Sequence, residues 1–305
     1  MQTVQVHPGA AERRVDAAAP LMPSERSPSY TTLVWSRFRR NRLALAAAGI
    51  ALAVCALALA APLIAPYDPI VGSIGERLQP LGSPGHILGT DEQGRDILSR
   101  ILYGGRVSIP AGILPVAVAT LFGGALGVLA GFAGGRVNLW IMRGTDVFYA
   151  FPAVMLAIAV SCALGAGVSN SIIAVTLIFI PPLCRVAEAA TRRVCTQEYV
   201  EIARAGGANA WQIVRCHVLG NILAPVLAYA SSLLGVSIIL VSGLSFLGLG
   251  VAPPQAEWGF MLSSLRDSIY TNPWVSIVPG AMIFLTSMAL NLVADGLREA
   301  MDVRL

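Results

Sequence analysis

The sequence predicts an all-α integral membrane protein with six transmembrane helices, and three observations support this fold class. Of its 305 residues, 55% are hydrophobic and only 12% are charged, whereas soluble domains carry about 25% charged residues. The mean hydropathy is +0.69. Finally, six apolar runs without internal charges alternate with polar segments. They are residues 43–65, 107–132, 147–164, a run that starts at 171–184, 222–250 and 273–294.

Residues 1–42 precede the first span. Residues 1–30 are rich in Ala, Pro, Ser and Arg without a period, which predicts disorder. The basic, aromatic run 35–42 (WSRFRRNR) predicts a short helix on the membrane surface. Residues 43–65 are long enough to cross about 30 Å of hydrocarbon. A cleaved signal peptide ending near residues 58–60 is the alternative, but the apolar run exceeds the usual length of about 7–15 residues.

The polar segment 66–106 follows, with mixed charge and several Pro and Gly residues. Thr90 is expected to cap a helix that starts with Asp91 and Glu92, because negative charge suits a helix N-terminus. In the second span, glycines recur every four residues, and such a ridge lets another helix approach closely. These glycines are Gly123, Gly127, Gly131 and Gly135.

The third and fourth spans and the later polar segments are predicted from their charged, proline and aromatic residues. Residues 134–146 are expected to form a short loop, and Phe151-Pro152 to kink the start of the third span. Pro181-Pro182 should kink the fourth span, with Arg185 marking its exit. In the polar segment 251–272, Glu257, Trp258 and Phe260 indicate a short helix at the membrane interface. The chain then divides into residues 1–42, 43–65, 66–106, a five-helix core 107–296 with a loop at 191–221, and a tail 297–305.

The longest charge-bearing run after the first hundred residues is 197–221, QEYVEIARAGGANAWQIVRCHVLGN. It predicts two short helices separated at Gly206-Gly207, because glycine readily turns the chain. The apolar positions of the two helices are Tyr199, Val200, Ala203 and Ala205, then Trp211, Val214 and Val218. A polar-faced helical hairpin between two spans suits docking to a soluble partner, and an ordinary solvated loop is the alternative.

The arginine distribution predicts the orientation of the chain. Of 21 basic residues, all arginine, 16 lie in residues 1–42, 134–146, 185–217 and 295–305, and five lie in 66–106 and 251–272. The positive-inside rule places the arginine-rich segments in the cytoplasm. Both termini and the hairpin are therefore expected there, with segments 66–106 and 251–272 outside.

The uncharged spans weigh against a proton-coupled transporter or a charge-lined channel, because such proteins use charged residues within the bilayer. A translocation path would use groups such as Ser231, Ser237, Ser242 and Asn291, although most of these suit helix packing. Without lysine, the chain has no GxxxxGK[ST] phosphate loop. The five cysteines form no CxxC pair. The sequence has no HExxH or GxSxG motif, which disfavours an enzyme. The net positive charge does not indicate nucleic-acid binding, because the arginines are distributed according to the membrane topology.

The hairpin resembles the signature loop of permease subunits of ATP-binding-cassette importers. That loop usually reads Glu-Ala-Ala, three residues, Gly, about nine residues, then an apolar residue and Leu-Pro. Residues 201–203, Gly207 and residues 217–221 match it, in the form of the dipeptide and oligopeptide group. Ile202, Gly206 and Gly220 depart from the pattern, and Gly220, which replaces Pro, puts a rigid exit turn in doubt.

A second stretch, 89–106, resembles the GTDxxGRDxxSRxxxGxR sequence of the second permease subunit in that group. The matching residues are Gly89, Thr90, Asp91, Gly94, Arg95, Asp96, Ser99, Arg100, Gly104 and Arg106. This segment could meet a substrate-delivering protein or only shape the entry to the next span.

The resemblance implies a type I importer permease in a bacterial inner membrane, whose hairpin is a coupling helix in a groove on an ATPase. It assigns the contact to Glu201, close approach to Ala203 and the turn to Gly207. The loop residues it implicates are Glu198, Glu201, Ala203, Arg204, Gly207, Trp211 and Leu219. It further implies a homologous second permease, two ATPase subunits that hold ATP and Mg, and an external substrate-binding protein. This chain itself should need no cofactor and no metal.

Di- and oligopeptides are the substrates that the resemblance implies. The alternatives are the same fold importing a nickel chelate, glutathione or an opine, a secondary transporter driven by a proton gradient, and an intramembrane enzyme or passive scaffold. His86 is the only histidine in the outer segments, which disfavours a nickel site built from several imidazoles.

Overall fold

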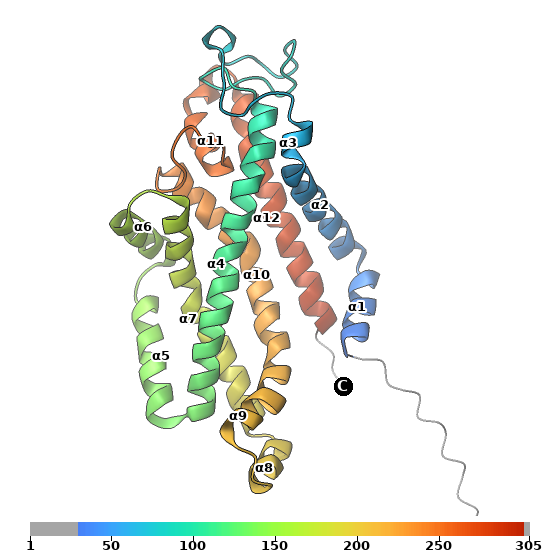
Figure 1. The fold of residues 1–305 in the computed structure, drawn as a ribbon, viewed down its shortest axis with the longest axis vertical. Helices are drawn as coiled ribbons and strands as arrows, with labels where there is room; N and C mark the ends of the chain where they lie inside the picture. Colours follow the sequence, from blue (N-terminus) through green and yellow to red (C-terminus); the bar gives the residue numbers. More distant parts are fainter. Residues whose placement is uncertain (1–29, 302–305) are drawn as a thin grey trace, which may run out of the picture.

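The computed structural model describes residues 30–301, and this part of the chain is built from helices and connecting loops (Figure 1). The helices are α1 (Tyr30–Arg40), α2 (Arg42–Leu59), α3 (Ala61–Ile64), η1 (Ile74–Glu76), α4 (Ile97–Ala133), α5 (Gly135–Tyr149), α6 (Ala153–Leu164), α7 (Val168–Cys195), α8 (Glu198–Ala205), α9 (Ala210–Ile213), η2 (Val214–Val218), α10 (Leu219–Phe246), α11 (Trp258–Ser264), η3 (Asp267–Tyr270) and α12 (Pro273–Met301). The predicted all-α fold class is confirmed.

Five helical stretches among the described residues are long and apolar enough to cross a membrane: α2, α4, α7, α12 and the continuous stretch Ala210–Phe246. Helices α5 and α6 supply a sixth crossing if they are counted as one span, although they are bent by 89°. The long helices run side by side, with α12 packed on α2 and α10, and α4 packed on α7 and α10 (Figure 1).

The third span differs from its expected form. Residues 134–146, expected to be a loop, are helical in α5, and the break falls between Tyr149 and Ala153. Pro152 explains the break, because proline lacks the backbone N–H and disfavours helical geometry at Phe151. The turn between α4 and α5 is instead made by Gly134 and Gly135, whose φ angles are +62° and +49°.

Helices α4 and α7 pack closely against each other through three of the four ridge glycines. A Cβ atom on Gly123, Gly127 or Gly131 would lie 2.3–2.7 Å from a carbonyl oxygen of α7. Only glycine therefore permits this approach. Gly135 does not belong to the ridge, because it is the first residue of α5, and nothing lies within 4 Å of a Cβ added there.

The fourth and fifth spans are longer than expected. Helix α7 continues past Arg185 to Cys195, and the second arm of the hairpin is not a separate helix. Instead α9, the π-helical turn η2 and α10 form one continuous stretch, Ala210–Phe246. Residue 220, where the family pattern has Pro and a rigid exit turn, lies inside α10, and Gly220 keeps the backbone N–H that proline lacks.

Candidate functional site

The hairpin between α7 and α10 lies at one end of the bundle, opposite the outer segment 66–96 (Figure 1). Helix α8 ends at Gly206, and the chain turns at Gly207, whose φ is +84°. The N–H of Ala208 donates to the carbonyl of Ala203 at 3.0 Å, which closes the turn. The left-handed φ requires glycine at 207, because an L side chain is strained there. Gly206 has a φ of −74° and carries no such requirement.

The second arm begins with a capping box. The side chain of Asn209 accepts from the N–H of Gln212 at 2.8 Å, and the Gln212 side chain accepts from the N–H of Asn209 at 2.9 Å. This reciprocal pair satisfies two free donors at the start of α9. The π-helical turn η2 follows, and π-turns inside helices are frequent at functional sites.

The inner side of the hairpin is fixed to the bundle by apolar packing. Val200 from α8 and Val218 from η2 are fully buried, and they form a cluster with Val194, Ile213 and Ile222. This packing joins both arms of the hairpin to the ends of α7 and α10. A force applied to the hairpin would therefore be transmitted to these helices as a rigid displacement.

The outer side carries the acidic residues. Glu198 and Glu201 are exposed, and within the described residues no hydrogen bond or ion pair holds either carboxylate. Ile202, at the position where the resemblance expects alanine, follows Glu201 directly and is 71% exposed. The hairpin thus presents two free carboxylates and an apolar side chain on one surface.

The apolar positions expected on the hairpin do not form one buried face. Trp211 is 67% exposed and Tyr199 is 41% exposed, whereas Val200 and Val218 are buried. The ring of Tyr199 lies 5.9 Å from that of His217 and connects the two arms.

The remaining hairpin residues lie nearer the bundle. The Arg204 guanidinium lies 5.9 Å from the Phe132 ring centroid, so it points toward the end of α4. Ala203 is half-buried, and Leu219 is 36% exposed.

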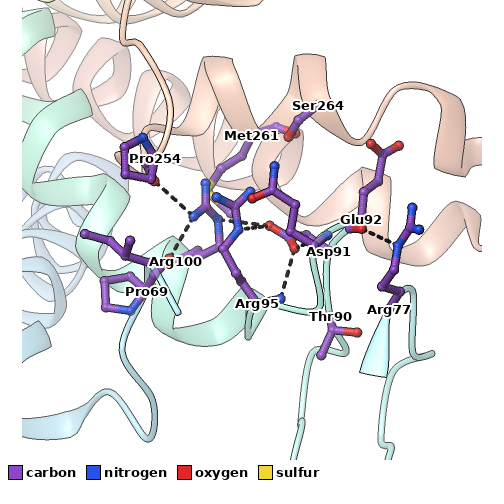
Figure 2. A network of polar contacts seen from close by, with 12 residues as sticks. Pro69, Arg77, Thr90, Asp91, Glu92, Arg95, Arg100, Pro254, Met261 and Ser264 are labelled. Carbon is purple, nitrogen blue, oxygen red and sulfur yellow. Dashed lines mark hydrogen bonds and ion pairs between the residues drawn. The ribbon is translucent and has the colours of Figure 1, made fainter. Parts of the chain in front are cut away.

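The outer segment 66–96 is organised around buried ionic contacts (Figure 2). The Nε of Arg95 donates to Oδ2 of Asp91 at 2.7 Å, and the Nε of Arg100 lies 3.4 Å from the same oxygen. Arg100 also donates to the carbonyl of Pro69 at 2.7 Å. The three charged residues are at most 3% exposed. This cluster, the Asp91–Arg95–Arg100 cluster, therefore contains two buried positive charges and one negative charge.

A second buried group starts α4. The Asp96 side chain accepts from the N–H and the hydroxyl of Ser99, each at 2.7 Å, and lies 2.9 Å from Nδ1 of His86. Asp96 is thus the N-cap of α4, and the expectation that Thr90 caps a helix beginning at Asp91 is wrong. Thr90 instead bonds to Gln79 and Glu76 across the loop, because residues 91–96 form a turn.

The motif glycines leave room for neighbouring backbone and rings. A Cβ on Gly89 would lie 2.2 Å from the carbonyl oxygen of Gln79, and one on Gly94 would lie 1.8 Å from that of Ser73. A Cβ on Gly104 would meet the Trp258 ring at 2.9 Å. Of the ten motif residues in 89–106, only Arg106 is exposed. The structure therefore places the motif inside the protein, as the framework that holds the outer segment on α4.

The sequence did not predict the contacts that fix α11 against α4. Glu257 caps α11 by accepting from the N–H groups of Gly259 and Phe260, and it accepts a hydrogen bond from Ser108 of α4 at 3.0 Å. The indole N–H of Trp258 donates to the carbonyl of Ile101 at 2.9 Å. The expected short helix is present as α11, and Trp258, at 1% exposed, packs inside the protein. The adjacent glycines 104 and 105 were the available signal, since a glycine pair in a helix makes room for a large ring.

The polar residues expected along a path are mainly packing groups. Ser237 is fully buried, Ser242 is buried, and Ser231 donates to the carbonyl of Ala228 within its own helix. Asn291 packs on Gly235, where a Cβ would lie 2.3 Å from its side-chain oxygen.

Comparison with known proteins gives two family matches. Residues 123–305 match the binding-protein-dependent transport system inner membrane component, and residues 29–80 match the N-terminal transmembrane domain of oligopeptide transport permease C. Two curated relatives cover nearly the whole chain. The glutathione transport system permease protein GsiD of Pectobacterium atrosepticum is 42% identical, over 89% of this chain and 90% of its own. The di/tripeptide transport system permease protein DppC of Pseudomonas aeruginosa is 38% identical, over 93% and 95%.

Among solved structures, a chain of the MetNI methionine ABC transporter, in an inward-facing conformation, has the same fold. The TM-score is 0.55 at 17% identity, over 67% of this chain and 97% of that chain. At this identity the likeness concerns the fold alone.

Proposed function

This chain belongs to the family of binding-protein-dependent transport system inner membrane components, and from that premise we propose that it is one of two permease subunits of an ATP-driven importer of short peptides. A second, homologous permease would complete the translocation path. Two ATPase subunits would hold ATP and Mg, and an extracytoplasmic binding protein would deliver the substrate. The chain itself would hold no cofactor.

The observation that carries the proposal is the outer surface of the hairpin. Glu198 and Glu201 are exposed carboxylates without partners among the described residues, on a hairpin whose inner side is packed on the bundle. A carboxylate of this kind can accept charge-assisted hydrogen bonds from an arginine or a backbone amide of an ATPase. Ala203, Ile202 and Trp211 would supply the apolar part of the same interface.

The charge distribution supports an external energy source. In α4, α7 and α12 the charged residues lie toward the helix ends, and α10 has none. A span whose charged residues are confined to its ends has no proton relay of the usual kind. ATP binding would instead favour one conformation of the assembly, and the hairpin would carry that preference to the helices, as a population shift.

Short peptides are the substrates that the relatives support. The two curated relatives are named for glutathione and for di- and tripeptides, which share a peptide backbone and a free carboxylate. We place the chain in a bacterial inner membrane with both termini and the hairpin in the cytoplasm, because 16 of its 21 arginines then lie inside.

The test measures uptake of labelled dipeptides and glutathione into proteoliposomes that contain the full assembly. Gly207→Asp should abolish ATP-driven uptake, because residue 207 has a φ of +84° and an aspartate also adds charge at the interface. Glu201→Gln should reduce uptake at least about tenfold, which corresponds to the loss of one charge-assisted contact. Neither change touches the buried side of the hairpin, so the amount of folded protein should stay the same.

Two controls are matched to these variants. Gly220→Ala adds a Cβ into open space in α10, and Asp295→Asn removes an exposed carboxylate away from the hairpin. Both should transport normally. Normal uptake by Gly207→Asp, or uptake driven by a proton gradient with ATP withheld, would exclude the proposed coupling.

A further inference from the structure

At the hairpin end of the bundle, a groove lies between α1, α10 and α12. Its volume is about 530 Å³, and all ten residues that line it are apolar or glycine. Trp35 from α1, Leu223 and Leu227 from α10, and Val293 and Leu297 from α12 form most of its walls. The ends of three helices thus enclose an apolar space next to the start of the first span.

Helix α1 is amphipathic and is fixed in place beside this groove. Phe38 is 8% exposed and packs with Ala44 and Ala300, so one side of α1 is held by α2 and α12. Trp35 is 57% exposed and stacks on Phe38 with ring centroids 6.1 Å apart. An exposed tryptophan at the end of a membrane span is typical of the boundary between lipid tails and headgroups.

Guanidinium groups flank the groove on two sides. The Cζ atom of Arg39 lies 5.7 Å from the ring centroid of Trp35, one of the groove walls. Arg298 lines an adjoining hollow that shares Ala224 and Met301 with the groove. Both side chains are exposed, so neither guanidinium group is enclosed by the protein.

The surrounding charge is mostly positive. Arg40 and Arg42 are exposed on the same short stretch as Arg39. Two acidic residues lie nearby on α12, Asp295 and Glu299, and the Glu299 carboxylate already accepts a hydrogen bond from Asn41 at 2.9 Å. Basic clusters that directly adjoin a membrane span bind acidic lipid headgroups.

We propose that this groove binds one acidic phospholipid of the leaflet that the hairpin faces. An acyl chain would lie in the apolar groove, and the phosphate would lie between Arg39 and Arg298. An apolar groove bordered by arginines matches a phospholipid better than a soluble anion, which would leave the groove unfilled. The inference depends on α2, α10 and α12 crossing a membrane, and not on the transport activity proposed above.

The test uses quenching of Trp35 fluorescence by brominated lipids in proteoliposomes of the full-length chain with its associated subunits. Subtracting the signal of Trp35→Phe isolates this tryptophan from the other four in the chain. Brominated phosphatidylglycerol should quench Trp35 at a much lower mole fraction than brominated phosphatidylcholine. Arg39→Gln combined with Arg298→Gln should remove this preference, at about fivefold per arginine, and high salt should weaken it.

The matched control replaces two exposed arginines of α5, Arg136→Gln combined with Arg143→Gln. They carry the same charge at the same end of the bundle but do not line the groove, so the lipid preference should stay unchanged. Equal quenching by the two lipids in the wild-type protein would overturn the proposal. So would an unchanged preference after loss of Arg39 and Arg298. Because the readout needs neither ATP nor peptide, its outcome is independent of whether the chain imports peptides.

Discussion

At the scale of single residues, the outer segment depends on an unequal number of buried charges. Asp91 is the only acidic member of its cluster with Arg95 and Arg100, and all three residues are at most 3% exposed. Nη1 of Arg95 and Nη2 of Arg100 have no hydrogen-bond partner among the described residues. Removing a charge from such a cluster should therefore have different effects depending on its sign.

Asp91→Asn should be more destabilising than Arg100→Met. The asparagine leaves two buried guanidinium groups without a countercharge, which typically costs about 3–5 kcal/mol. The methionine leaves the Asp91–Arg95 pair balanced and loses mainly the hydrogen bond to Pro69, worth about 1–3 kcal/mol with its carbonyl unsatisfied. Thermal unfolding of the purified protein in detergent would measure both. If the unfolding temperature fell equally in both variants, or further in Arg100→Met, another group would have to neutralise the excess positive charge.

The sequence predicted some of these single positions and not others. The glycine pair at 206–207 predicted the hairpin turn, because a turn needs a flexible backbone whatever surrounds it. Thr90 and Asp96 both follow the rule for helix caps, and only the three-dimensional contacts of Asp96 with Ser99 and His86 decide between them. The burial of Trp258 and the exposure of Trp211 also depend on neighbours distant in the chain.

At the scale of helices, the α4–α7 pair determines how the core is built. Its glycines 123, 127 and 131 form one side of α4, and the buried cluster that includes Ala119, Val175 and Leu183 continues the contact. A four-residue glycine period is visible in sequence and predicted a close helix contact, but not that α7 is the partner. The partner depends on the bend between α5 and α6, which returns the chain to α4.

Gly127→Ala and Gly124→Ala should have opposite effects on stability. A Cβ at residue 127 would lie 2.3 Å from the carbonyl oxygen of Cys184, whereas nothing lies within 4 Å of one at residue 124. Overpacking of this kind costs about 1–3 kcal/mol, and alanine in an open helical position gains about 0.5–1 kcal/mol over glycine. Thermal unfolding in detergent again provides the measurement. If both variants unfolded at the wild-type temperature, α4 and α7 would not be in tight contact.

Helix boundaries were less predictable than the existence of helices. The long apolar runs gave the membrane-crossing helices, because apolar length alone is sufficient for that inference. The sequence prediction missed helix α5, because its polar residues indicated a loop. These residues are Arg136, Asn138, Arg143 and Asp146. Two of these side chains instead face α7, where Asn138 donates to Glu188 at 2.6 Å and Asp146 pairs with Arg185.

At the scale of the whole molecule, the outer segment and the hairpin lie at opposite ends of the bundle (Figure 1). The apolar stretches of the long helices between them, residues 107–132, 168–184, 222–246 and 273–294, carry no charged residue. This arrangement suits a protein that receives work at one face and substrate at the other. It requires the two ends to lie on opposite sides of the membrane, with the hairpin on the arginine-rich side.

Ile74→Cys and Ile202→Cys test this orientation, in a background without the five native cysteines. Ile74 is 82% exposed in the outer segment and Ile202 is 71% exposed on the hairpin, so both cysteines should be reactive where the reagent can reach them. In cells that lack the ATPase subunits, which would otherwise cover Ile202, a maleimide that does not cross membranes should label Ile74→Cys in spheroplasts and Ile202→Cys only in inverted vesicles. Ala119→Cys, at a fully buried position, should remain unlabelled in both and reports intact packing. Labelling of Ile202→Cys in intact spheroplasts would place the hairpin outside, where no ATP is available, and the coupling role of Glu201 and Gly207 would then be untenable.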